Sequence, residues 1–342
     1  MKKYLLLLLI TQAFTMNAFA EQKKQNNAHN EAEDLAPEPT SNTTITSYQW
    51  AKEAHSSRKS RRHNPPPSVS SLMIAHTSPV TVMSTVITTP IFWGSSWANS
   101  TLASDKIIGL SYWYSNLNSS HYKSTVSEYT NLIHSSIAPL FVNSATSVSS
   151  SNPSNVLTQV CTAVGSANVK SNGYYPVYTD LPRGTANYCA YHSAGTCGRT
   201  QIQFAFFFNL NNDPGCDPAS PYAPVAGAAN AQNPGLVAGG SSAYQQSQGL
   251  AALVNVSAHE LMETVTDPGI GGIWGGWYDS TGAENGDKCA WTFGPSNTGL
   301  SSGTVLIGGF DWKLQGEWSN TAQINQTGYL TTGSLKGCVT GS

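Results

Sequence analysis

Residues 257–268 read SAHELMETVTDP and carry the side chains in this sequence that are best suited to chemistry. His259 and Glu263 are four positions apart, so on a helix they lie on one face, one turn apart, as two ligands of one metal ion require. Glu260 lies about 100° further round, where H-E-x-x-H zinc enzymes place their catalytic carboxylate. The string therefore predicts either a metal site, with a carboxylate in place of the second histidine, or an ordinary amphipathic helix.

The surrounding residues favour a long, buried helix. Apolar residues recur at helical spacing over residues 242–266, and Pro268 and Gly269 then end the pattern. Buried carboxylates need a cation or hydrogen-bond donors, yet residues 64–342 contain only 8 Lys and Arg. A metal ion would satisfy the carboxylates, which favours the metal-site interpretation of the motif.

A glycine-rich acidic stretch, GGWYDSTGAENGDKCAW, supplies candidates for a third ligand. We expect Asp287 first and Glu284 second, followed by Asp267 or His192; Asp279 belongs to the same stretch. Such acidic residues also occur as turn residues or as the oxygen ligands of a small Ca²⁺ site. A carboxylate in place of a histidine makes a site harder and lowers the Lewis acidity of its ion. The expected cofactor is Zn²⁺, with Ca²⁺ as the alternative, structural ion.

The N-terminus is typical of an export signal. Lys2 and Lys3 precede the apolar run YLLLLLITQAFTM, and the small residues Ala18 and Ala20 suit a signal peptidase. The run is too short for a transmembrane span. We therefore expect residues 1–20 to be a signal peptide and the chain to be secreted, through the periplasm, without membrane insertion after cleavage.

Charge and cysteine content narrow the partners and the means of stabilisation. The net charge is −2 and only 11% of residues are charged, so nothing favours binding to nucleic acid or to an anionic membrane. Six cysteines in an exported chain predict up to three disulfides, whose pairing the sequence leaves open. We expect Cys289 to be bridged, with Cys338 or one of the four upstream cysteines as its partner.

A change in composition marks a boundary before the folded part. Residues 21–63 carry 13 charges in 43 positions, whereas the following 279 residues carry 21. The early segment lacks apolar periodicity, which predicts disorder over residues 21–69. It contains RKSRRHNPPP, which is either part of a solvated linker or a propeptide processing point at Arg61 and Arg62. The folded domain is expected to span residues 70–342.

The remaining chain has the pattern of one α+β domain. Alternating and β-branched residues predict strands within 80–94 and over 173–180, 187–193 and 200–210. Helical spacing predicts helices over 104–117 (with Ser104 as N-cap), 122–133 and 155–164, and a loop rich in Gly, Ala and Pro covers 223–240. We expect a mixed or antiparallel sheet packed on helices, a zincin-like active-site helix and stabilising disulfides. The strand QIQFAFFFNL is apolar enough to be central; at a cleft edge it would instead pair with an extended peptide.

The motif strings also resemble a known family. VNVSAHELMETVTDP, followed by GWYD and GAENGDKCAW, is similar to the phosphate-induced protein (EXORDIUM-like) family, particularly its bacterial members. TPIFWGSSW and YCAYH fit the same family, so the resemblance covers residues 80–340. It implies an extracellular protein, and its plant members are linked to cell growth and to phosphate or carbon status. Many plant members lack the His-Glu pair, which implies that the fold does not depend on it.

Two functions are compatible with these residues. The first is a secreted zinc-dependent hydrolase, most simply a metallopeptidase acting on a peptide or protein. His259, Glu263 and an acidic residue of the glycine-rich stretch would hold the ion, and Glu260 would pass a proton from water to the leaving amine. The second is a non-catalytic EXORDIUM-like protein that binds an extracellular glycan or a protein partner, with its acidic cluster holding a structural metal.

Overall fold

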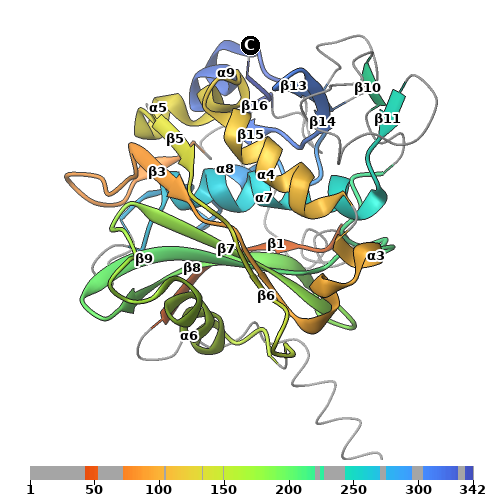
Figure 1. Cartoon of the computed structure of the whole chain (residues 1–342). Helices are drawn as coiled ribbons and strands as arrows, with labels where there is room; N and C mark the ends of the chain where they lie inside the picture. The colour runs from red at the N-terminus through yellow and green to blue at the C-terminus, as the bar shows by residue number, and fades with distance from the viewer. Residues whose placement is uncertain are drawn as a thin grey trace, which may run out of the picture.

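The computed structural model describes most of the chain from residue 43 onward, namely residues 43–52, 72–103, 105–132, 134–148, 150–219, 224–226, 243–269, 275–294, 303–329 and 336–341. The expected signal peptide, the basic cluster at residues 58–62 and most of the loop predicted over 223–240 lie outside the described residues. The described part is an α+β fold in which a curled mixed sheet packs against helices (Figure 1).

An eight-stranded sheet organises the molecule. Its main path runs β1-β8-β9-β7-β3-β5, and β4 and β6 continue it beside β7. The pairs β1–β8 and β8–β9 are antiparallel, whereas β9, β7, β3 and β5 run parallel. The strands are β1 (Thr43–Trp50), β3 (Thr85–Thr88), β4 (Ile91–Trp93), β5 (His134–Ile137), β6 (Phe141–Asn143), β7 (Gly173–Pro182), β8 (Tyr188–Cys197) and β9 (Thr200–Asn209).

The composition of the strands explains this order. The first seven residues of β7 and the run Ile202–Phe208 of β9 are buried, as expected for strands covered on both faces. β8 and β9 form a tight hairpin in which Gly198 has a φ of +63°, a conformation that favours glycine. Pro90, which lacks a backbone N–H, lies between β3 and β4. The strand predicted at QIQFAFFFNL is thus central, between β8 and β7, and its alternative placement at a cleft edge is wrong.

Helices cover both faces of the sheet. Figure 1 shows α6 on one face and α7 with α4 on the other, with the C-terminal strands beyond α7. Contacts of α6 with β7, β8 and β9, and of α7 with β1, β8 and β9, agree with this arrangement. The helices are η1 (Ser95–Ala98), α3 (Ser100–Ala103), α4 (Lys106–Leu117), η2 (Tyr122–Val126), α5 (Ser127–Thr130), α6 (Pro153–Val164), α7 (Gln248–Thr266), α8 (Asn285–Lys288) and α9 (Asn320–Asn325).

The motif helix α7 is buried along its whole length. Every residue from Gly249 to Thr266 is buried, as expected for a helix surrounded by other elements. The Ser247 side chain caps its start by accepting a hydrogen bond from the Leu250 N–H at 3.1 Å. Pro268 follows directly after the C-cap residue Asp267. The prediction of a long buried helix is confirmed, although α7 begins six residues later than expected because β11 precedes it.

Small two-stranded sheets complete the fold beside α7. They pair β2 with β12, β10 with β11, β13 with β14, and β15 with β16. Their bounds are β2 (Ile74–Ala75), β10 (Pro224–Ala226), β11 (Ala243–Gln245), β12 (Trp277–Tyr278), β13 (Thr304–Ile307), β14 (Phe310–Lys313), β15 (Glu317–Trp318) and β16 (Cys338–Val339).

Three disulfides fasten the elements to one another. They join Cys161 to Cys197, Cys189 to Cys216, and Cys289 to Cys338. The expectation that Cys289 is bridged is therefore confirmed, and its partner is Cys338. Cys289 is the C-cap residue of α8 and Cys338 begins β16, so this bridge fixes the acidic stretch to the C-terminal strands.

Two further segments differ from the sequence expectation. Residues 43–50, placed in a disordered segment, form β1 and pair with β8. The helix expected over 122–133 is split into η2 and α5 and ends at Asn131, which adopts a left-handed φ of 49°. Within the described residues, no helix is long and apolar enough to cross a membrane.

Candidate metal centre

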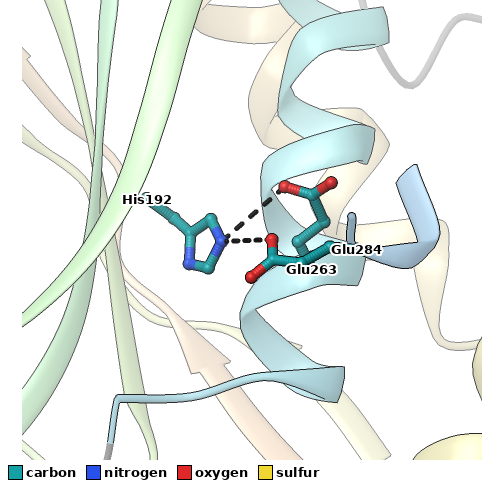
Figure 2. A group of neighbouring side chains, drawn as sticks. All are labelled: His192, Glu263 and Glu284. Atoms are coloured by element: carbon teal, nitrogen blue, oxygen red, sulfur yellow. Dashed lines mark hydrogen bonds and ion pairs between the residues drawn. The ribbon is translucent and has the colours of Figure 1, made fainter. Parts of the chain in front are cut away.

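Three elements bring their polar side chains together at the C-terminal half of α7. His259 and Glu263 come from successive turns of this helix, His192 comes from β8, and Glu284 is the N-cap residue of α8. Figure 2 shows His192, Glu263 and Glu284 converging between the sheet and the helix. These four side chains are at most 1% exposed, so the group is enclosed by the fold.

Short contacts link the four side chains into one cluster. Glu263 Oε2 lies 3.1 Å from His259 Nε2 and 3.7 Å from His192 Nε2. His192 Nε2 lies 3.1 Å from Glu284 Oε2. Tetrahedral coordination with bonds of about 2.0–2.1 Å places neighbouring ligand atoms about 3.3–3.4 Å apart. The three separations bracket this spacing. His192, Glu263 and Glu284 form one group whose ligand atoms all lie within 4.8 Å of one another, and Glu263 links this group to His259.

The donor set indicates which metal these residues fit. Two imidazole nitrogens and two carboxylates suit Zn²⁺, whereas Ca²⁺ takes oxygen ligands alone. Asp287 forms a second group with His259 and Glu263, whose ligand atoms all lie within 4.8 Å of one another. Of the four metal ligands expected from sequence, His259, Glu263 and Asp287 lie in this second group, whereas Glu284 lies in the first group with Glu263 and His192. His192, ranked behind the acidic candidates, belongs to the cluster as closely as any of them.

The short helix α8 is shaped to approach α7. Its capping box joins Glu284 and Asp287 across the first turn, and the Asp287 N–H donates to Glu263 Oε1 at 2.9 Å. A Cβ added to Gly286 would lie 2.7 Å from His259 Nδ1 and 2.9 Å from Glu263 Oε1. Glycine at this position therefore permits the contact between the two helices.

The buried carboxyl groups of the cluster have histidines, and no Lys or Arg, as ion-pair partners among the described residues. Burial raises the pKa of Glu263 and of Glu284 well above the ordinary range, and neighbouring carboxylates add to both shifts. Burial lowers the pKa of His192 to about 3, so its imidazole is neutral, as a metal ligand requires. Among the described residues, the ion-pair partners of Glu263 and Glu284 are histidines. A divalent cation would reverse this situation by favouring the ionised carboxylates.

Glu260 contacts the sheet at β1. Its Oε1 accepts a hydrogen bond from the backbone N–H of Gln49 in β1 at 3.2 Å. Its Oε2 accepts none from the described part of the chain, although the residue is fully buried. Burial raises the pKa of Glu260 well above its ordinary range, and backbone hydrogen bonds from Gln49 and His192 offset part of the shift. A buried carboxylate with a raised pKa is suited to proton transfer.

Gln315, which the sequence reasoning missed, positions the His259 ring. Its Nε2 lies 2.9 Å from His259 Nδ1 and 3.1 Å from the Gly286 carbonyl oxygen, and its Oε1 accepts from the Trp291 N–H at 3.3 Å. Donation to Nδ1 leaves the proton of a neutral His259 on Nε2, facing Glu263. A cation on Nε2 would require the opposite tautomer, in which Nδ1 carries the proton and the Gln315 amide presents its oxygen to it.

A second missed acid, Glu317, supports the cluster from β15. It is fully buried, accepts from the Tyr122 hydroxyl at 2.9 Å and from Asn285 Nδ2 at 3.1 Å, and burial raises its pKa well above the ordinary range. Neither Gln315 nor Glu317 belongs to a recognisable motif, so no local signal pointed to them.

Of the two other acidic candidates, Asp267 adjoins the cluster through a side-chain hydrogen bond with Glu284, whereas Asp279 has its partners elsewhere. Asp267 accepts from the Tyr278 hydroxyl and, at 3.2 Å, from the Gly276 N–H; burial raises its pKa to about 6. Asp279 pairs with Lys288 at 2.9 Å. Asp279 therefore behaves as a turn residue, which was the alternative interpretation of this stretch.

Comparisons with protein-family models, with curated proteins and with solved structures find no match for this chain. The interpretation of the cluster therefore depends on its own geometry and chemistry.

Proposed function

We propose that this chain is an exported Zn²⁺-dependent hydrolase that cleaves peptides. The observation that carries the proposal is a set of three short contacts, at 3.1 to 3.7 Å, that join buried ligand atoms of His192, His259, Glu263 and Glu284. The ion, when bound, would polarise a substrate carbonyl and acidify a water molecule. The three disulfides are compatible with an oxidising, extracytoplasmic compartment.

Glu260 is the group that we assign to proton transfer. Its Oε1 accepts from the backbone N–H of Gln49 at 3.2 Å, so the carboxyl group lies within hydrogen-bond reach of a main-chain amide. In the reaction, the oxygen of water bonds to the carbonyl carbon and a water proton passes to Glu260. Glu260 then delivers this proton to the amide nitrogen as the C–N bond breaks, leaving an acid and an amine.

Catalysis needs one open position on the ion, because catalytic zinc sites keep three protein ligands. His192 is held by the sheet, and His259 and Glu263 are held by a 19-residue helix. Glu284 starts a helix of only four residues. We therefore assign Glu284 as the ligand that exchanges with water.

A structural zinc site is the second candidate, and one observation favours it. All four ligand residues are at most 1% exposed, and closed four-ligand sites are typically structural. The glycan-binding alternative has less support, since the exposed large hydrophobic residues of the described part are all aliphatic: Ile74, Ile108, Val142, Leu306 and Ile324. The resemblance to the EXORDIUM-like family stays a prediction.

Elemental analysis and a hydrolysis assay test the proposal together. The purified full chain should contain about one zinc per chain, and the His259→Ala variant should contain none. Cleavage of a quenched-fluorescent peptide mixture should stop with a chelator and return with Zn²⁺. Zinc retention with no cleavage, before and after proteolytic nicking of residues 53–71, would favour the structural site. A chain without zinc would refute both candidates.

A further inference from the structure

β1 is an edge strand that comes from outside the expected domain. It runs antiparallel to β8, with partners from Thr43↔Gly195 to Trp50↔Tyr188, and has no second neighbour among the described strands. Residues 53–71 separate it from the next described segment and contain the basic cluster RKSRR. The sequence RKSRR is a recognition site for a trypsin-like protease, so cleavage there would separate β1 from the rest of the chain.

The backbone of β1 contacts the proton-transfer group directly. The register between β1 and β8 shifts on both sides of residues 47–49, and such shifts redirect backbone groups. As a result the Gln49 N–H donates to Glu260 Oε1 at 3.2 Å. The Gln49 side chain donates to Gln315 Oε1 at 3.3 Å, and Gln315 in turn contacts the His259 ring.

Side chains and backbone anchor this end of β1 in the same way that a bound peptide is held. The Tyr48 ring lies 4.9 Å from that of Tyr188 and 5.8 Å from that of Tyr191, both on β8. The Trp50 carbonyl accepts from Trp291 Nε1 at 2.7 Å. Backbone pairing supplies affinity and pockets for alternate side chains supply selectivity in this mode of recognition.

From these contacts we infer that β1 is a pro-strand which occupies the substrate groove of the hydrolase, and that the substrate is an extended polypeptide pairing antiparallel with β8. The inference depends on the proposed function and deepens it. An incoming substrate would present a main-chain N–H to Glu260 where Gln49 does now. Cleavage within the basic cluster would free β1 to dissociate, leaving β8 as an open edge.

The pro-strand also accounts for the closed state of the centre. Gln49 is fully buried and contacts both Glu260 and Gln315. Loss of β1 would remove the Gln49 N–H from Glu260 and free the edge of β8 that now pairs with β1, His192 included. The burial that favours a structural zinc site therefore describes the intact chain, and an open site is expected after processing.

The test compares the intact chain with a chain nicked by limited trypsin treatment, with all fragments retained. If β1 is detached for about 1% of the time in the intact chain, nicking and dilution should raise peptide cleavage about 100-fold, because only the open fraction binds substrate. A variant with Arg58, Lys59, Arg61 and Arg62 changed to Gln is the matched control and should keep its low rate. A synthetic peptide of residues 43–52 should inhibit the nicked chain competitively.

A pair of substitutions tests the contact with Glu260 without proteolysis. Gln49→Pro removes the N–H that donates to Glu260 and should raise cleavage by the full chain, whereas Gln49→Ala keeps that N–H and should raise it less. Equal cleavage by intact and nicked chains, or no inhibition by the 43–52 peptide, would overturn the pro-strand inference. If the chain still contained zinc and still cleaved peptides, the proposed function would be unaffected. Loss of zinc from the wild-type chain would instead refute the proposed function.

Discussion

Asp279 and Glu284 are five residues apart in the chain, but their carboxyl groups have opposite electrostatic surroundings. Asp279 lies in a turn, where its Oδ1 accepts from Thr281 and Ala283 and its Oδ2 pairs with Lys288 at 2.9 Å. Although burial raises its pKa, the Lys288 ammonium and the Thr281 hydrogen bonds outweigh that effect and hold the pKa below its ordinary value. Glu284 lies in the cluster, where burial and neighbouring acids raise its pKa well above the ordinary range.

The difference shows how a turn residue can be told from a ligand candidate when both are acidic. Asp279 has its own cation and donors, so nothing further is needed to stabilise its charge. Glu284 and Glu263 are buried against each other and against two histidines, so their ionised forms need an added cation. If this difference is correct, substitutions in the cluster should change zinc binding and substitutions at Asp279 should not.

His259→Ala should abolish both zinc binding and hydrolysis and should lower the stability of the fold. The substitution removes a ligand, and the binding free energy of a metal contributes to folding. Zinc content and the thermal midpoint measure these effects. His134→Ala, at an exposed position of β5, is the control and should change neither. A His259→Ala chain with full zinc content would place the ion elsewhere.

Glu260→Gln should abolish most hydrolysis while zinc content and thermal stability change little. Glu260 accepts a hydrogen bond from the Gln49 backbone and is assigned to proton transfer, not to metal binding. Loss of a general base typically lowers the rate by about 10² to 10⁴. The rate is measured on the nicked chain, where β1 no longer competes. Loss of zinc in this variant would make Glu260 a ligand and contradict the assigned roles.

Gly286→Ala should weaken zinc binding by about 10- to 100-fold, the range typical of changes just outside the ligands. The added methyl group would press on His259 and Glu263 at 2.7 to 2.9 Å. Gly282→Ala is a matched comparison, since nothing lies within 4 Å of its added Cβ but its φ is +81°. That variant should lose stability through backbone strain and keep its zinc affinity. Equal affinities, measured by competition with a chelator, would count against the close approach of α8.

Asp279→Asn should have the smallest effect. It weakens one ion pair and keeps an oxygen for Thr281, so we expect a loss of about 1 kcal/mol in the free energy of unfolding. Zinc content should be unchanged. Denaturant unfolding and elemental analysis check the two results, and a loss of zinc would show that the turn and the cluster form one site.

The sequence predicted those parts of the site that depend on local spacing. His259 and Glu263 share a face of α7 because they are four residues apart, and the burial of the helix followed from its apolar pattern. His192 joins them only because β8 packs against α7, and the strand pattern says nothing about which helix turn it meets. Gln315 depends in the same way on the packing of the chain after β14.

β1 was missed for a different physical reason. Its surroundings in the sequence are rich in charge and lack apolar periodicity, which is the signature of disorder. What holds the strand is pairing with β8 and the contacts of Tyr48 and Gln49, and these exist only once the domain has formed. The sequence around β1 therefore gives little sign that the strand binds to its own domain.

Anomalous X-ray diffraction at the zinc absorption edge, on crystals of the full chain grown with Zn²⁺, locates the ion itself. We expect one peak about 2.0–2.1 Å from His192 Nε2, His259 Nε2 and an oxygen of Glu263, with Glu284 or a water in the fourth position. No peak between these side chains, or a peak held by Asp279 instead, would contradict this expectation.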